Sequence, residues 1–184
     1  MAEADLKLAY DAVRGKRSTY IYRHQKGKTF FHRRPVVDTV SPAMAEVRRR
    51  FRAAADYVRD VLADPALRAA YEPLAEAQKA RISQVIMTDY LRSPVIDDID
   101  LGGFTGAVGS TFKVRALDDC GVMSVAIEIR AADDTLLEQG AATKVGSKWV
   151  YAATVAHPEG TPITITATAV DRPGNKGTKA VTWG

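Results

Sequence analysis

The sequence predicts an α+β protein, with a helical front half that carries a β-hairpin and a following β-sandwich of seven short strands. Between Ser41 and Leu91, apolar residues recur at spacings of three and four, which is the period of an amphipathic helix. From Ser110 onward they recur at every second residue, which is the period of a half-buried strand. We therefore expect two regions, 1–93 and 94–184.

The helical region has recognisable boundaries. Ser41 before Pro42 is typical of an N-cap followed by proline at the first helical position, where a missing N–H costs nothing. The same pattern at Asp64–Pro65 predicts the start of a second helix. Pro73 is expected to break or restart that helix, and the last helix is expected to end before Pro94, because the residue before a proline disfavours the helical conformation.

The stretch 16–35 predicts a β-hairpin. β-branched and aromatic residues at 19–22 and 29–31 flank a short turn that contains glycine. Between Arg14 and Arg34 there are eight lysines and arginines and no acid. A two-stranded hairpin is marginal in water, so we expect it to lie on the helices or on a partner. A short helix over 3–13 is expected to precede it.

The second half shows seven short runs of alternating residues, separated by turn signals such as 118–121, 146–147 and 172–175. Seven such runs are typical of a β-sandwich. Three motifs add to this pattern: Ala116-x-Asp118-x-x-Gly121-Val122-x-Ser124-Val125, Gly146-x-x-Trp149-x-Tyr151, and Thr166-Ala167-x-Ala169-x-Asp171-x-x-Gly174-Asn175. Through them, residues 110–184 resemble a bacterial immunoglobulin-like domain. The resemblance implies an immunoglobulin-like sandwich and no particular chemistry.

The front half has a resemblance of its own. It is carried by Gly15, Arg23, Gly27, Arg33-Arg34-Pro35, and Ser41-Pro42-Ala43 leading to Arg48-x-x-Phe51. These residues resemble small proteins of unknown function from phages and Bacteroidetes genomes, which combine a basic hairpin, a proline and a Thr-x-Ala-Gln helix start. This chain has Met44 and Ala45 where those proteins are rich in glutamine. The resemblance implies a structural or assembly role and a phage-derived origin.

Composition limits the class of protein. Apolar residues make up 46% of the chain and charged residues 26%, which are ordinary values for a globular protein. The single cysteine, Cys120, excludes an internal disulfide and fits a reducing compartment. The first residues lack the basic and apolar segments of a signal peptide, and no run reaches the roughly 20 apolar residues of a membrane span. We expect a cytoplasmic protein, or one in a virion-like particle assembled in the cytoplasm.

Charge is divided unevenly along the chain. Residues 1–92 hold 18 Lys and Arg against 11 Asp and Glu, a net charge of +7, whereas residues 93–184 hold 8 against 11, a net charge of −3. Such an asymmetry predicts that the front half meets something acidic, or that opposite halves of neighbouring copies meet each other.

Motifs for catalysis are missing from the sequence. Three histidines and one cysteine do not form a zinc pattern, and neither a phosphate-binding Gly-x-x-x-x-Gly-Lys-Ser/Thr nor a Gly-x-Ser-x-Gly motif is present. We expect a protein that is not an enzyme and needs no cofactor. In an immunoglobulin-like topology Asp98, Asp118, Asp119 and Asp171 would lie at one pole, which makes them candidates for a calcium site. The alternative is that they are ordinary turn aspartates that accept backbone N–H groups.

The basic hairpin and the first long helix supply the candidate interaction surface. Its residues are Tyr20, Tyr22, Arg23, Lys26, Lys28, Phe30, Phe31, Arg33, Arg34, Arg48, Arg49 and Arg52. Aromatic residues with arginine favour a protein contact or self-assembly. The same residues could instead neutralise phosphates and stack on bases of a nucleic acid, or form a solvated basic surface whose aromatic residues pack on the helices.

Overall fold

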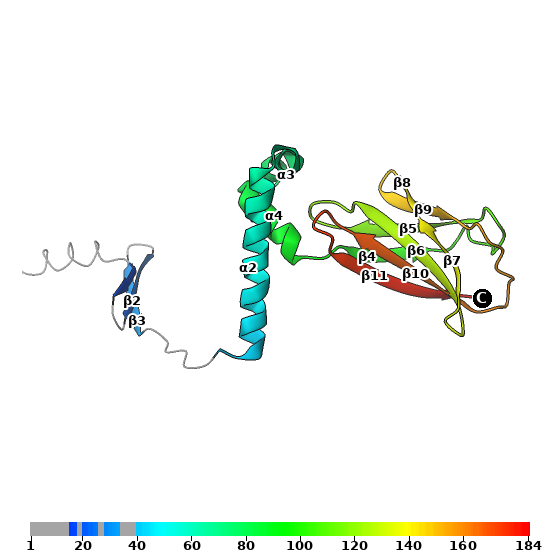
Figure 1. Cartoon of the computed structure of the whole chain (residues 1–184), viewed down its shortest axis with the longest axis horizontal. Helices are drawn as coiled ribbons and strands as arrows, with labels where there is room; N and C mark the ends of the chain where they lie inside the picture. Colours follow the sequence, from blue (N-terminus) through cyan, green and yellow to red (C-terminus); the bar gives the residue numbers. More distant parts are fainter. Residues whose placement is uncertain (1–14, 18–19, 26–27, 34–39) are drawn as a thin grey trace, which may run out of the picture. The chain divides into compact units, whose positions relative to one another are not determined.

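A computed structural model describes residues 15–17, 20–25, 28–33 and 40–184. The chain forms two compact units, Met1–Glu46 and Val47–Gly184 (Figure 1). The helix expected at 3–13 lies outside the described residues. Within the described residues, no helix combines the length and the apolar content that crossing a membrane requires.

The first unit contains a three-stranded antiparallel sheet in the order β1-β2-β3. The strands are β1 (Gly15–Arg17), β2 (Tyr20–Gln25) and β3 (Lys28–Arg33). β2 and β3 form the hairpin predicted at 16–35, with Gln25 opposite Lys28 at the turn. The third strand, β1, was not predicted, because three residues are too few to show an alternating pattern.

Three helices follow: α2 (Pro42–Ala63), α3 (Pro65–Ala77) and α4 (Ile82–Leu91). Both predicted N-caps are present. The Met44 N–H donates to Ser41 Oγ at 3.2 Å, and Asp64 Oδ1 accepts from the N–H groups of Ala66 and Leu67 at 2.8 and 3.2 Å. These bonds satisfy N–H groups that have no partner inside the helix.

The break expected at Pro73 is wrong. Pro73 lies inside α3, and the chain leaves the helix only near Lys79, whose φ is +50°. Tyr71 and Ala75 flank the proline and are both buried in the core between the helices. The burial of these neighbours offsets the roughly 3 kcal/mol that a proline costs in a helix interior.

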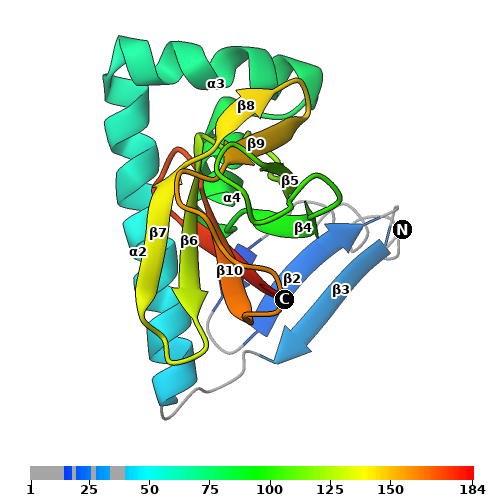
Figure 2. The same cartoon turned by 90° about the vertical axis from the view of Figure 1, so that its right-hand side faces the viewer.

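The second half of the chain is built of eight antiparallel strands. They are β4 (Val95–Asp100), β5 (Thr111–Leu117), β6 (Ser124–Ala131), β7 (Leu136–Ala141), β8 (Thr143–Val145), β9 (Lys148–Ala152), β10 (Ile163–Val170) and β11 (Lys176–Trp183). They form two sheets of four strands, ordered β4-β5-β9-β8 and β11-β10-β6-β7 (Figure 2).

The α+β class is therefore confirmed, but the strand count differs from the predicted seven. The additional strand is β8, which pairs with β9 through a turn at Gly146, where φ is +61°. β7 and β8 are separated by Ala142 alone, and they belong to different sheets. The chain thus changes sheets directly after the run 135–142, which the sequence predicts as a strand.

Two apolar cores hold this part of the chain together. One lies between the sheets and takes alternate residues of β10, among them Ile163 and Ile165. The other lies among the helices and includes Val61, Tyr71 and Ile86. Cys120, from the turn between β5 and β6, is buried in the helical core. The helices and the sandwich therefore share a packed joint.

Candidate functional site

The hairpin brings the predicted aromatic and basic positions into register. The paired positions are Tyr20 with Arg33, Tyr22 with Phe31, and Arg23 with Phe30. Lys28 and Arg33 are exposed, and Phe30 is 46% exposed. Lys26 and Arg34 lie outside the described residues. An exposed phenylalanine between exposed cations is consistent with the predicted contact surface.

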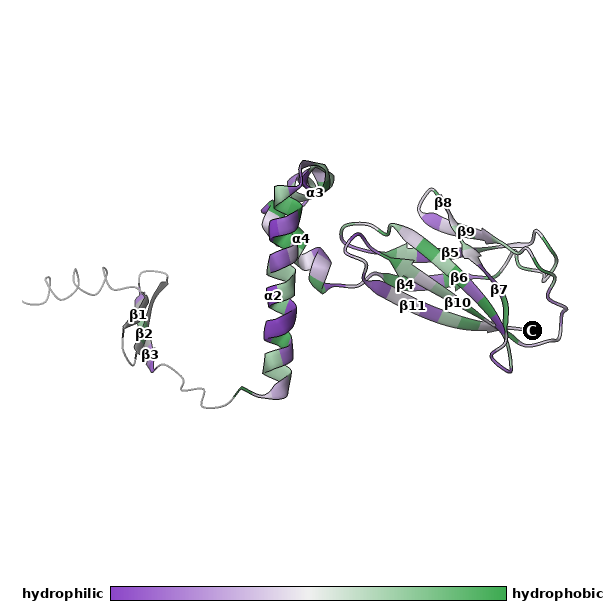
Figure 3. Ribbon diagram, in the orientation of Figure 1, coloured by the Kyte–Doolittle hydropathy of each residue, from purple (hydrophilic) through white to green (hydrophobic). Residues whose placement is uncertain are grey.

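The apolar stripe of α2 is covered at one end only. Val47, Phe51, Ala54, Val58 and Val61 recur at alternating spacings of four and three, which places them on one face of the helix. Figure 3 shows hydrophobic and hydrophilic segments alternating along α2. The last three residues of the stripe are buried, and Val58 and Val61 belong to the core among the helices. Val47 and Phe51 are 52% and 53% exposed. The stripe therefore continues beyond the helical core that covers its far end.

The remaining predicted residues of α2 lie beside this stripe. Arg48, Arg49 and Arg52 are all exposed. Between them, Arg50 donates through Nη2 to the main-chain oxygen of Leu91 at 3.2 Å, which ties α2 to the end of α4. The first half of α2 thus presents exposed apolar residues next to exposed guanidinium groups.

Three carboxylates converge where α4 meets the sandwich. They belong to Asp89 of α4, Asp118 of the turn between β5 and β6, and Asp171 at the end of β10, and one oxygen of each lies within 4.8 Å of the others. Asp89 and Asp171 are buried, and Asp118 is partly buried. Three segments far apart in the sequence therefore form a single acidic cluster, which we call the acidic joint.

Asp89 is the most enclosed member of the acidic joint. Its Oδ2 accepts a 2.5 Å hydrogen bond from the Tyr71 hydroxyl, which lies 3.2 Å from the hydroxyl of Tyr57. Its Oδ1 has no hydrogen-bond partner among the described residues. Burial raises the pKa of the Asp89 carboxyl to about 6; the Tyr71 hydrogen bond opposes this shift, and the nearby carboxylates of Asp118 and Asp171 add to it.

The other two carboxylates also organise their turns. Asp118 Oδ1 accepts from the N–H groups of Cys120 and Gly121, both at 2.8 Å. Asp171 Oδ1 accepts from the Asn175 N–H at 2.6 Å, and Asp171 Oδ2 from the Asn175 side chain at 2.7 Å. Both bonding patterns are those of turn aspartates.

The four predicted calcium candidates do not all meet. Asp118 and Asp171 come together as expected, whereas Asp119 pairs with Arg92 at 2.6 Å and Asp98 lies on β4. Asp89 completes the cluster and was not predicted. An acid on an otherwise apolar helix face, three residues after Ile86, was the signal available for it.

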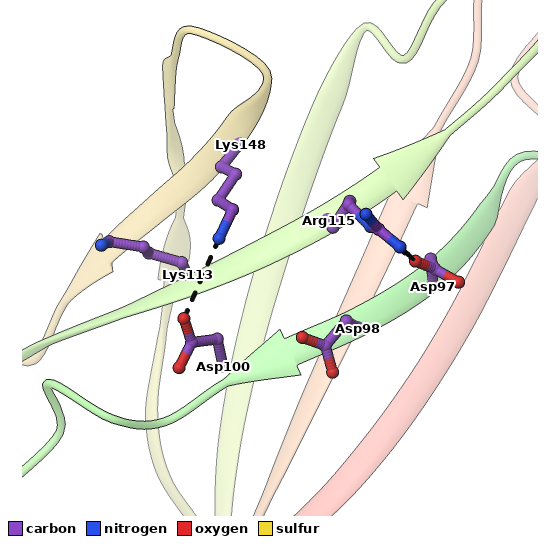
Figure 4. Close-up of a pocket in the computed structure, with 6 residues that line it drawn as sticks. All are labelled: Asp97, Asp98, Asp100, Lys113, Arg115 and Lys148. Carbon is purple, nitrogen blue, oxygen red and sulfur yellow. Dashed lines mark hydrogen bonds and ion pairs between the residues drawn. The ribbon is translucent and has the colours of Figure 1, made fainter.

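Asp98 instead lines a shallow groove of about 400 Å³ on the sheet that contains β4 and β5 (Figure 4). The groove is lined by three acids and three bases: Asp97, Asp98, Asp100, Lys113, Arg115 and Lys148. Arg115 forms an ion pair with Asp97, and Lys148 Nζ lies 3.9 Å from Asp100 Oδ2. These balanced charges explain the groove as a cross-strand ladder that protects a sheet edge.

A buried polar network lies away from all predicted sites. Glu138 is 5% exposed, and its Oε1 accepts from the Tyr151 hydroxyl at 2.8 Å and from the Thr154 N–H at 2.6 Å. Its Oε2 lies 3.0 Å from His157 Nε2. Burial alone would raise the pKa of Glu138, but the hydrogen bonds from Thr154, His157 and Tyr151 outweigh it and lower this pKa to about 2.

Comparison with known proteins gives no family. No protein-family model and no curated protein matches the sequence. Among solved structures, CopC from Methylosinus trichosporium OB3b matches with a TM-score of 0.36 and 14% identity, over 48% of this chain and 89% of CopC. The N-terminal part of the bacterial S-layer protein SbsC matches with a TM-score of 0.35 and 14% identity, over 77% of this chain and 40% of that chain.

Proposed function

We propose that this chain is a non-enzymatic structural protein that assembles through the basic hairpin and the first half of α2, with a second copy of the same chain as its partner. The uncovered apolar stripe of α2 carries the proposal. Val47 and Phe51 are half exposed on a helix whose later stripe residues are buried. Two such stripes can cover each other, because spacings of three and four suit helix-on-helix packing.

The charge of the chain bears on how two copies would meet. The front region carries a net charge of +7 and the back region −3, so in a dimer held by its apolar stripes the front of each copy would attract the back of the other. Exposed arginines beside apolar residues are also typical of protein interfaces. We propose in addition that the protein is of phage-derived origin and is located in the cytoplasm, as the sequence analysis expects.

In this proposal the sandwich is an immunoglobulin-like spacer or presentation module. In immunoglobulin-type sandwiches the first, second, fifth and fourth strands form one sheet, and the third, sixth and seventh strands form the other. The order β4-β5-β9-β8 supports the assignment because it corresponds to the first of these sheets, and β6-β10-β11 corresponds to the second. Here β7 would be an added strand on that second sheet. A sandwich with open edges can also pair with a neighbouring sheet.

Nucleic-acid binding is the alternative, and the exposed arginines 48, 49 and 52 favour it. The two functions differ in their response to salt. Contacts to phosphates weaken steeply as salt rises, whereas contacts anchored by apolar side chains weaken little.

The decisive experiment is the mass of the full chain in solution at low and high salt, with and without added DNA or RNA. We expect a concentration-dependent oligomer that survives high salt. The substitution Phe51→Ser removes about 1 kcal/mol of apolar burial from each copy, and so raises the dissociation constant of a dimer about 30-fold.

Leu67→Ser is the matched control, because Leu67 is 41% exposed on α3 and lies outside the stripe. We expect this variant to assemble like the unmodified chain. A monomer at all concentrations and salts would refute the assembly proposal. If that monomer bound nucleic acid only at low salt, the alternative function would replace it.

A further inference from the structure

We infer that the acidic joint is a binding site for a hard divalent cation, best matched by calcium, held by Asp89, Asp118 and Asp171. The site lies between α4, the turn after β5 and the end of β10. It is separate from the surface on α2 and does not depend on the proposed function.

The spacing of the oxygens fits one ion. Calcium binds oxygen at about 2.3–2.6 Å, so two ligands on opposite sides of the ion lie about 4.6–5.2 Å apart. The three carboxylate oxygens all lie within 4.8 Å of one another. A single calcium ion could therefore contact all three of them after only small adjustments of the side chains.

Asp89 gives the independent observation that a ligand belongs here. Its side chain is 1% exposed, it contributes an oxygen to the cluster, and its Oδ1 has no hydrogen-bond partner among the described residues. The Cys120 thiol lies close enough to hydrogen-bond to the Asp89 carboxyl, but a thiol is only a weak donor. A buried carboxylate oxygen without a strong donor is costly unless a cation supplies the missing interaction.

The ordinary explanation for clustered turn aspartates covers only two of the three. Asp118 and Asp171 accept backbone N–H groups of their own turns, as such residues commonly do. Asp89 lies in a helix and has no turn to organise. Its convergence with the other two requires a different explanation.

Arg172 is the nearby cation that could balance the cluster, but its geometry does not fit that role. Its guanidinium lies over the Tyr71 ring at 4.7 Å, and its Nη1 is buried without a hydrogen-bond partner in the described part of the chain. Even if its full charge counted, one guanidinium would leave two of the three carboxylate charges unbalanced. An ion with two charges matches that deficit.

The ligand types select the ion. Three carboxylates and no imidazole make up the cluster, and such oxygen sets suit calcium and magnesium, whereas zinc favours sulfur and nitrogen ligands. Magnesium requires a stricter octahedral geometry and keeps more of its water. Ligands from three separate segments fit the more adaptable coordination of calcium.

The test titrates the full chain, freed of metal by a chelator, with calcium chloride in a calorimeter and in thermal melts. We expect saturable heat and a rise in Tm of about 5–10 °C at a calcium concentration about 100-fold above Kd. Terbium luminescence gives a direct readout of the site, because Tyr71 contacts Asp89 and would sensitise a bound lanthanide. Added calcium should displace the terbium and so reduce the luminescence.

Two variants and one control locate the ion. Asp89→Asn and Asp118→Asn each keep the size of the side chain and should remove the calcium-dependent heat, the Tm shift and the terbium signal. Asp98→Asn changes a carboxylate on β4 outside the cluster and should leave all three unchanged. No heat and no Tm shift at millimolar calcium would overturn the inference, as would loss of binding in Asp98→Asn alone.

Discussion

Acid should destabilise the sandwich through Glu138. In the folded protein the pKa of this carboxyl is lowered from 4.5 to about 2, since its hydrogen bonds outweigh the effect of burial. The unfolded chain therefore takes up a proton at Glu138 at a higher pH than the folded chain does. The stabilising contribution is complete above about pH 4.5 and is lost as the pH falls toward 2.

The size of the effect follows from the shift. Each pKa unit corresponds to 1.36 kcal/mol, so Glu138 contributes about 3 kcal/mol to the free energy of unfolding at neutral pH. Two titratable groups face Glu138. His157 Nε2 lies 3.0 Å from Glu138 Oε2, and the Tyr151 hydroxyl donates to Glu138 Oε1 at 2.8 Å. Replacing Glu138 with glutamine keeps the shape but removes the charge that strengthens these hydrogen bonds.

Urea unfolding at pH 7 and at pH 3, followed by the fluorescence of the buried Trp149, measures the prediction. At pH 7 the Glu138→Gln variant should have a free energy of unfolding about 1.5–3 kcal/mol below that of the unmodified protein. Between pH 7 and pH 3 its free energy of unfolding should fall by less than that of the unmodified protein. Glu159→Gln, an exposed carboxyl in the loop before β10, is the control and should follow the unmodified protein. Equal acid sensitivity in Glu138→Gln and the unmodified chain would refute the reasoning.

Further substitutions test the joint, the helix α3 and the loop between β4 and β5. Asn175→Ala should lower the free energy of unfolding by about 1–2 kcal/mol in urea titrations, because the Asn175 side chain donates to the main-chain oxygens of Asp89 and Arg92 at 3.1 and 3.0 Å. Pro73→Ala should raise it by about 1–3 kcal/mol, because the proline interrupts the hydrogen bonding of α3. Gly106→Ala should lower Tm far more than Gly109→Ala: both glycines have φ near +80°, but a Cβ at Gly106 alone would meet a main-chain oxygen, at 2.1 Å.

Much of the fold could be predicted because its signals are local. The caps at Ser41 and Asp64 and the alternation along β10 depend on residues close in sequence, and the structure contains all three. Pro73 and β8 could not be predicted in this way. The first is held in a helix by the burial of its neighbours, and the second is shorter than one full alternation.

The acidic joint shows the same limit in a functional setting. Asp118 and Asp171 were placed together correctly because an expected strand topology brings their turns to one end. The third residue was sought on β4, at Asp98, whereas the structure supplies Asp89 from α4. Finding it required knowing how the last helix packs on the sandwich, and periodicity within either region contains no information about that packing.

That packing determines what assembly through α2 would achieve. The end of α4 is tied to the sandwich by Asn175, by the ion pair of Arg92 with Asp119, and by Cys120 in the helical core. Arg50 ties α2 to the same end of α4. A partner bound to the stripe of α2 would therefore hold the sandwich in a defined orientation, because these contacts connect the two without a flexible linker. A cation at the acidic joint would add a fourth tie at the same place, so calcium should stiffen the connection between the assembling helix and the sandwich.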